Sequence, residues 1–103
     1  MTMGGGGALM EEPAVDTRHG FFVNHDLAGY EVPVHADIPH QDVIFIDELD
    51  PTTSPMKAKG AGELGLCGVS AAIANAICNA TGVRVRDHPI TLDKLLARLP
   101  PVA

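Results

Sequence analysis

Prolines limit what this 103-residue chain can fold into, because they divide its first half into short pieces. A proline has no backbone N–H, so it ends a helix and is excluded from the middle of a sheet. Pro13 therefore closes any helix that the opening run GGGGALMEE forms. Pro33 and Pro39 leave YEVPVHADIPHQ extended, at a sheet edge or across a surface rather than in a central strand.

Between these breaks the residues predict an α+β chain that is part of a domain, with a few strands and two later helices. Glycines 4–7 are either a linker or the small-residue face of a helix. The turn DTRHG ends at Gly20 and joins the residues before it to FFVN, which predicts a hairpin. DVIFID, residues 42–47, has the best strand pattern, since β-branched and aromatic residues stand between aspartates. VRVRD, residues 83–87, is a shorter strand candidate.

The second half of the chain predicts a central helix and a C-terminal helix. The central helix, about 69–81, has an apolar stripe at helical spacing, formed by Val69, Ile73, Ala76, Ile77 and Ala80. Gly82 follows as the residue that ends this helix. The C-terminal helix, about 91–98, is amphipathic, with Thr91 as its N-cap and Pro100 beyond its end.

The large side chains needed for a sizeable core are scarce. The chain is 46% hydrophobic, but it has no Trp, one Tyr and three Phe, so much of that share is Ala and Val. A short chain needs large apolar side chains to offset its conformational entropy. We therefore expect this chain to pack against something bigger.

Charge and hydropathy exclude several kinds of partner. The formal net charge is -6, and the seven Lys and Arg residues do not cluster, so there is no basic footprint for nucleic acid. The longest apolar stretches contain Asn, Gly or Ser, and we expect no membrane span. The N-terminal residues lack the cationic and long apolar regions of a signal peptide. We expect a cytoplasmic protein, with the periplasm as the alternative.

One carboxylate, Glu63, stands in the glycine-rich stretch KAKGAGELGLCG, residues 57–68. Its glycines leave backbone N–H groups free to face a ligand, and Lys57 and Lys59 add cationic donors. The positive end of the following helix points to the same loop, which suits an anionic ligand such as phosphate. That position also suits Glu63 to accept a proton rather than donate one.

The loop fits neither common nucleotide signature. GAGELG, residues 60–65, has the G-x-G-x-x-G spacing, but it follows a proline-rich connector rather than a strand. A Walker loop would place the lysine after the glycines, whereas Lys59 precedes them. From the pattern alone, a solvated glutamate in a glycine-rich turn is the commoner explanation.

Several uncommon strings in one order resemble a known family. KGAGELG followed by GVSAAIANAICNATGVRVRDHPIT is similar to the C-terminal end of the molybdenum-binding large subunit of the xanthine dehydrogenase/aldehyde oxidase family, bacterial type. GALMEE, YEVPVHADIPHQDVIFID and DPTTSPMKAKGAGE extend the resemblance over essentially the whole chain. Since the family's large subunit is several times longer, the resemblance implies that residues 1–103 are a C-terminal fragment of a molybdopterin-binding domain.

The resemblance implies a role for each residue of the loop. Glu63 corresponds to the active-site base beside molybdenum, and Lys59, Gly60, Ala61 and Gly62 line the pterin cofactor. The family hydroxylates aldehydes or aromatic N-heterocycles with water as the oxygen source. No protein side chain is expected as a metal ligand, because the pterin dithiolene holds the metal. Lys57 departs from the family, which often has glycine there.

The resemblance also implies cofactors and partners. The expected cofactor is molybdopterin with molybdenum, in the cytosine dinucleotide form, and 2Fe-2S and FAD groups belong to partner subunits. The expected partners are the remainder of the large subunit, an iron–sulfur subunit, an FAD subunit and a small-molecule substrate. One alternative is a truncated, non-catalytic fragment or interaction module that binds no cofactor by itself. Another is a small anion-binding domain that uses the glycine loop for phosphate.

Two further features suggest chemistry on first inspection. HADIPHQD carries two histidines and two aspartates, but Pro39 breaks helical geometry and an extended chain points alternate residues to opposite faces, so a surface segment is favoured over a metal site. Cys67 follows Glu63 by four residues, but it lacks a local histidine partner, so packing is favoured over nucleophilic catalysis.

Overall fold

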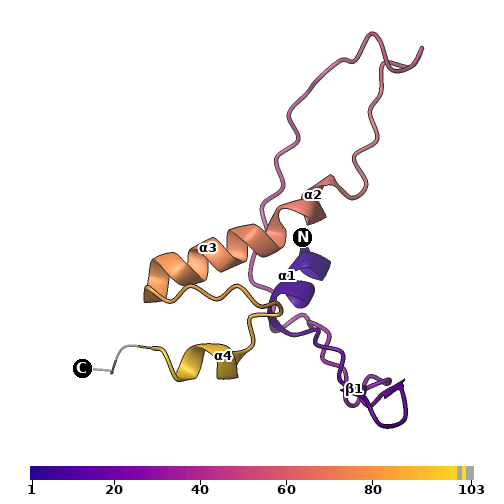
Figure 1. The fold of residues 1–103 in the computed structure, drawn as a ribbon. Helices are drawn as coiled ribbons and strands as arrows, with labels where there is room; N and C mark the ends of the chain where they lie inside the picture. Colours follow the sequence, from indigo (N-terminus) through magenta and orange to yellow (C-terminus); the bar gives the residue numbers. More distant parts are fainter. Residues whose placement is uncertain (100, 102–103) are drawn as a thin grey trace.

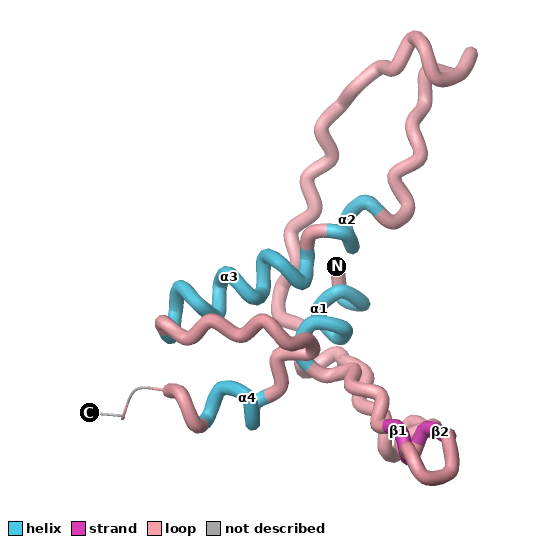
Figure 2. The backbone as a smooth tube through the Cα atoms, in the orientation of Figure 1, coloured by secondary structure: helices cyan, strands magenta, loops and turns pink. Residues whose placement is uncertain are grey.

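The computed structural model describes residues 1–99 and 101 (Figure 1). Its elements, in chain order, are α1 (Thr2–Leu9), β1 (Val15–Asp16), β2 (Phe21–Phe22), α2 (Leu64–Cys67), α3 (Val69–Thr81) and α4 (Leu92–Leu96). A long loop without helix or strand connects β2 to α2 (Figure 2). We call residues 41–62 of this loop the arm. Residues 41–49 are its outgoing leg, 50–56 its tip and 57–62 its return leg.

The chain is extended rather than compact. Its radius of gyration is 18.3 Å and its extents are 53 × 44 × 25 Å, whereas a compact domain of this length has a radius of gyration of about 13 Å. The arm and the β1–β2 hairpin project away from the helices in different directions (Figure 1). Among the described residues, the buried hydrophobic side chains are Ala8, Val85 and Ile90. The core is as thin as the composition predicts.

This small core forms where α1 packs against α3. The glycine run is helical, so the small-residue face, and not the linker, is the correct alternative. A Cβ added at Gly4 would lie 2.7 Å from the Cβ of Val69, so only glycine lets the two helices approach this closely. The backbone N–H of Ile90 donates to the carbonyl oxygen of Ala8 at 2.6 Å and ties the later chain to the end of α1.

Helix α3 has the bounds that its apolar stripe predicts, Val69–Thr81. Gly82 ends it in the left-handed conformation, with φ 75°, and its N–H donates to the carbonyl of Cys78 at 2.9 Å. The structure also adds a separate short helix, α2, between Glu63 and α3, which the sequence pattern did not predict.

The C-terminal helix is shorter than the predicted 91–98. Regular helix covers only Leu92–Leu96, and beyond it the N–H groups of Arg98 and Leu99 both donate to the carbonyl of Leu95, at 2.8 and 3.1 Å. Thr91 occupies the N-cap position with an extended backbone, but its hydroxyl makes no capping hydrogen bond.

The hairpin is present where the turn sequence predicts it. β1 and β2 are antiparallel, with Val15 opposite Phe22 and Asp16 opposite Phe21. Gly20 adopts φ 74°, the left-handed region that favours glycine. The carboxylate of Asp16 accepts a hydrogen bond from the N–H of Arg18 at 2.7 Å, which closes the turn.

The other two predicted strands are absent from the described residues. A strand needs the N–H and C=O groups of a neighbouring strand, and among residues 1–99 and 101 no such neighbour lies beside residues 42–47. Residues 83–87 instead run back along α3, where the guanidinium of Arg84 donates to the side-chain oxygen of Asn75 at 2.8 Å.

One helical stretch, Leu64–Thr81, has the length and composition to cross a membrane. It spans 18 residues with a mean hydropathy of 1.4, and none of it is buried within the chain, so the expectation of no membrane span stays a prediction. A core helix of a soluble protein meets the same criteria, and a turn at Gly68 divides this stretch into α2 and α3.

Candidate active site

Glu63 directly follows the arm and is the N-cap residue of α2. Its backbone is held, because its carbonyl oxygen accepts hydrogen bonds from the N–H of Leu66 at 3.0 Å and the thiol of Cys67 at 3.8 Å. Its side chain is exposed and forms no hydrogen bond or ion pair with any residue between 1 and 99. The carboxylate is therefore available to a group from outside the chain.

The glycines before Glu63 are not explained by packing within this chain. A Cβ added at Gly60 or Gly62 would meet nothing within 4 Å, and neither residue has a positive φ. This differs from Gly4, whose added Cβ would collide with Val69. Bare backbone with open space beside it allows close approach of a group that this chain does not itself supply.

A hollow of about 490 Å³ lies beside this loop. It is lined by Met1, Gln41, Val43, Ile44, Phe45, Ile46, Ala61, Gly62, Leu64 and Gly65. The lining residues come from the outgoing leg of the arm, from the glycine loop and from the start of α2, together with Met1. Two of the four predicted cofactor-lining residues, Ala61 and Gly62, therefore border a concave surface.

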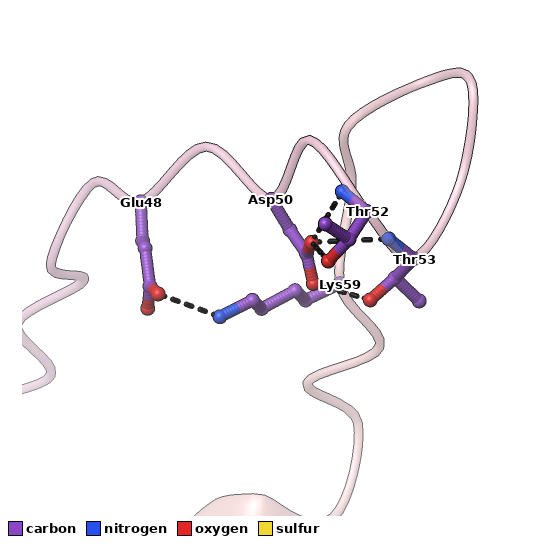
Figure 3. Close-up of polar contacts among 5 residues, drawn as sticks. All are labelled: Glu48, Asp50, Thr52, Thr53 and Lys59. Carbon is purple, nitrogen blue, oxygen red and sulfur yellow. Dashed lines mark hydrogen bonds and ion pairs between the residues drawn. The ribbon is translucent and has the colours of Figure 1, made fainter.

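Lys59 is paired within the chain. Its Nζ lies 2.7 Å from Oε1 of Glu48, on the opposite leg of the arm (Figure 3). Both side chains are exposed, at 44% and 67%, so the pair contributes only about 0.2–1 kcal/mol. An anion with several acceptor oxygens can displace so weak a partner. Sequence reasoning identified Lys59 but missed Glu48, because the two meet only across the reversal of the arm.

The tip of the arm is fixed by one carboxylate, Asp50, which the sequence reasoning also missed. Asp50 accepts hydrogen bonds from the N–H and hydroxyl of Thr52, at 2.9 and 2.8 Å, and from the N–H and hydroxyl of Thr53 (Figure 3). These hydrogen bonds hold the pKa of Asp50 well below its usual range, and the bond from the Thr53 hydroxyl contributes most. An aspartate followed by threonines two and three residues later is the sequence signal for such a turn.

The return leg begins with an unusual backbone conformation. Lys57 has φ 56°, in the left-handed region that favours glycine. Its N–H donates to the carbonyl of Ser54 at 3.0 Å, and its own carbonyl accepts from the N–H of Asp50 at 3.4 Å. The lysine thus occupies a position at which the family resemblance implied glycine, and the backbone conformation explains that preference.

The other chemical candidates do not converge on this loop. The four side chains His35, Asp37, His40 and Asp42 are exposed, and His40 pairs with Asp42 at 3.0 Å. Among the described residues, no three His, Cys, Asp or Glu side chains could together hold a metal ion. The exposure of these four side chains agrees with a surface segment. Cys67 is exposed, contrary to the expectation that it packs.

Comparison with known proteins identifies the class to which this loop belongs. No family model matches the chain. The chain is 78% identical over 102 residues to the aldehyde oxidoreductase molybdenum-binding subunit PaoC of Escherichia coli strain K12, covering 99% of the chain and 14% of that protein. It is 37% identical over 95 residues to the putative xanthine dehydrogenase molybdenum-binding subunit XdhA of the same strain, covering 92% of the chain and 12% of that protein. It is 39% identical over 74 residues to an aldehyde oxidoreductase of Megalodesulfovibrio gigas, covering 71% of the chain and 8% of that protein.

The chain therefore belongs to the xanthine dehydrogenase/aldehyde oxidase family of molybdenum-binding oxidoreductase subunits. The family resemblance inferred from the loop and helix sequences is confirmed. The chain spans 14% of the length of PaoC and no more of the other two relatives.

Proposed function

We propose that this chain is the C-terminal segment of a molybdenum hydroxylase large subunit that oxidises aldehydes or aromatic N-heterocycles, with water as the oxygen source. The observation that carries the proposal is the 78% identity, over 99% of the chain, to a protein described as an aldehyde oxidoreductase molybdenum-binding subunit. That description favours aldehydes over N-heterocycles as the substrate class.

Glu63 is the general base in this proposal. A base must come within about 2.6–3.2 Å of the group whose proton it takes. The Glu63 carboxylate is exposed and unbonded to the described residues, while its backbone is held by Leu66 and Cys67. A fixed backbone with a free carboxylate is the arrangement that proton transfer to an external group requires.

Lys59, Gly60, Ala61 and Gly62 would hold the cofactor, molybdopterin in its cytosine dinucleotide form. The residues fit such a group: the Cβ positions of Gly60 and Gly62 are open, and Ala61 and Gly62 border the hollow of about 490 Å³. Lys59 can exchange its exposed partner Glu48 for an anionic oxygen of the cofactor. When bound, the cofactor supplies the molybdenum redox centre that takes two electrons from the substrate.

The proposed partners are the remainder of the large subunit, an iron–sulfur subunit and an FAD subunit, assembled in the cytoplasm. Most large apolar side chains of this chain are exposed, among them Leu27, Ile44 and Phe45. Such surface needs cover, which supports a position against the rest of the large subunit. The 2Fe-2S and FAD subunits, which would carry the electrons away, follow from family membership.

The second candidate is a fragment that is not catalytic by itself, and the thin core favours it for the isolated chain. Among the described residues the buried hydrophobic side chains are Ala8, Val85 and Ile90. A Cβ added at Gly60 or Gly62 would meet nothing within 4 Å, so this chain leaves the loop before Glu63 open on that side. Molybdenum and pterin analysis of the purified 103-residue chain separates the candidates. We expect neither group to co-purify, and stoichiometric molybdenum would show that the segment binds the cofactor alone.

The test of the proposed function is Glu63→Gln in the complete large subunit with its partners. Glutamine keeps the size of the side chain but cannot accept the proton, so we expect turnover to fall by about 10²-fold or more, with cofactor content unchanged. Glu31→Gln is the matched control, because it removes the same charge from an exposed residue outside the glycine loop and outside the hollow beside it. Near-normal turnover of the Glu63→Gln enzyme would remove the assignment.

A further inference from the structure

Residues 42–47 carry the most exposed apolar run of the chain. Val43, Ile44, Phe45 and Ile46 are 60%, 87%, 81% and 89% exposed. The backbone of 42–47 is equally bare, since none of its N–H or C=O groups takes part in a backbone hydrogen bond with the described residues. The apolar side chains and the backbone of residues 42–47 both lack partners. A position within a sheet would cover the side chains and pair the backbone N–H and C=O groups at the same time.

The pattern of the run specifies how it is covered. Successive side chains of an extended chain point to opposite faces, so Val43 and Phe45 lie on one face and Ile44 and Ile46 on the other. A strand with one solvated face alternates apolar and polar residues, whereas a strand buried on both faces is continuously apolar. The run is continuous and ends at Asp42 and Asp47. Both faces therefore need cover.

We propose that residues 42–47 form a β-strand within a sheet contributed by the part of the large subunit outside these 103 residues, where both faces of the strand are buried. The inference rests on the proposed function, in that it takes the chain as a segment of the large subunit. The chain corresponds to 14% of the length of PaoC, so the remainder is long enough to supply such a sheet.

A second copy of the chain is a less favourable strand partner, because an aspartate stands at each end of the run. Antiparallel pairing of two copies centred on this run would set Asp42 opposite Asp47, and parallel pairing in register would set each aspartate opposite itself. Like charges directly opposite one another destabilise a strand pair. The chain also carries a formal net charge of -6, so two copies repel each other.

The strand would also position the loop that carries Glu63. The Lys59–Glu48 ion pair and the hydrogen bond from the N–H of Asp50 to the carbonyl of Lys57 join the two legs of the arm. Residues of the outgoing leg and of the glycine loop line the same hollow. Fixing residues 42–47 in a sheet therefore fixes part of the lining that this hollow shares with the glycine loop.

Hydrogen exchange of the assembled holoenzyme tests the proposal directly. We expect the amides of residues 43–47 to exchange at least about 100-fold more slowly in the complete subunit than in the isolated 103-residue chain. Equally fast exchange in both would overturn the proposal. So would protection in the isolated chain that rises with protein concentration alongside dimer formation, since a second copy would then be the partner.

Substitutions in the complete subunit test whether both faces are buried. Ile44→Asp and Phe45→Asp place a charge on opposite faces, and we expect each to lower the yield of assembled subunit several-fold. Ile44→Val and Phe45→Leu are matched controls that keep an apolar side chain and should assemble normally. If only one of the two aspartate variants lost assembly, the strand would have a solvated face and the proposal would be wrong.

The outcome is separable from that of the proposed function. Glu63→Gln changes no residue of the strand, so the protection of residues 43–47 should persist in that variant. Loss of turnover in Glu63→Gln without protection of 43–47 would leave the base assignment standing and remove only the strand. Protection of residues 43–47 together with normal turnover of the Glu63→Gln enzyme would leave the strand standing and remove the base assignment.

Discussion

At the scale of single residues, Asp50 is the side chain with the most hydrogen bonds in the described chain. It receives four, from the backbone N–H and hydroxyl groups of Thr52 and Thr53 (Figure 3). These bonds reverse the arm and bring Lys59 beside Glu48 on the other leg. Glu63, in contrast, has no such partners, and that freedom suits a group that acts on something outside the chain.

The hydrogen bonds of Asp50 predict a pH dependence of the arm tip. They favour the ionised carboxylate, so its folded-state pKa lies below the unfolded value of about 3.9. The stabilisation is therefore complete above the unfolded pKa and is lost as pH falls through the lower folded-state pKa. We expect the amide protons of Thr52 and Thr53 to titrate below the usual aspartate range when NMR spectra of the chain are recorded against pH.

Asp50→Asn is the control for this titration. The amide has no proton to gain in this range, so the two threonine amides should lose their pH dependence. Titration of these amides at the ordinary aspartate pKa would show that the turn is not held by the ionised side chain.

At the scale of elements, the contact of α1 with α3 depends on glycine. Gly4, Gly6 and Ala8 are the buried residues of α1. Gly4 and Ala8, four residues apart, share one face, and a Cβ added at Gly4 would meet Val69 of α3. Gly6 lies on the other side of the helix, where an added Cβ would lie 2.7 Å from the ring of Pro33. A run that resembles a flexible linker is thus the packed surface of a helix.

Neighbouring glycines of α1 should respond oppositely to the same substitution. Gly4→Ala places a Cβ 2.7 Å from the Cβ of Val69, and we expect the strain to lower stability by about 1–3 kcal/mol. Gly5→Ala meets nothing within 4 Å and should raise stability by about 0.5–1 kcal/mol through helix propensity. Thermal unfolding of the complete subunit measures both. Shifts of Tm in the same direction would contradict the α1–α3 contact.

At the scale of the whole molecule, the chain has the surface of a part rather than of a finished domain. Its radius of gyration, 18.3 Å, exceeds the value of about 13 Å for a compact domain of this length. Among the described residues its buried hydrophobic side chains are Ala8, Val85 and Ile90, while the arm exposes four consecutive apolar side chains, Val43 to Ile46. The α+β class expected for residues 1–103 stays a prediction, since the described residues form a single two-stranded sheet beside the helices.

The open shape predicts how the isolated 103-residue chain behaves in solution. With so little buried area to offset chain entropy, we expect a broad, weakly cooperative thermal transition. Small-angle X-ray scattering should give a radius of gyration of about 18 Å or more. A sharp transition together with a radius of about 13 Å would show that the chain folds compactly alone.

Much of the local structure and of the site could be predicted from the sequence. The apolar stripe of α3, its ending at Gly82 and the Gly20 turn depend on contacts within a few residues, which a local pattern encodes. The role of Glu63 followed from the family resemblance, because the local pattern by itself favours a solvated glutamate, and that role stays a prediction. The family of the chain was predicted from several uncommon sequence strings that occur in one order, and the identity to a known molybdenum-binding subunit confirms it.

Only the tertiary structure decided which segments meet. The glycine run became a packed helix because α3 lies against it, and Lys59 gained Glu48 because the arm reverses between them. Residues 42–47 have strand-forming side chains but no strand, because a β-strand exists only with a partner and the part of the chain that the structure describes offers none. Helix and turn geometry are local properties of a sequence, whereas strand pairing and ion pairs across a reversal require a second segment in the right place.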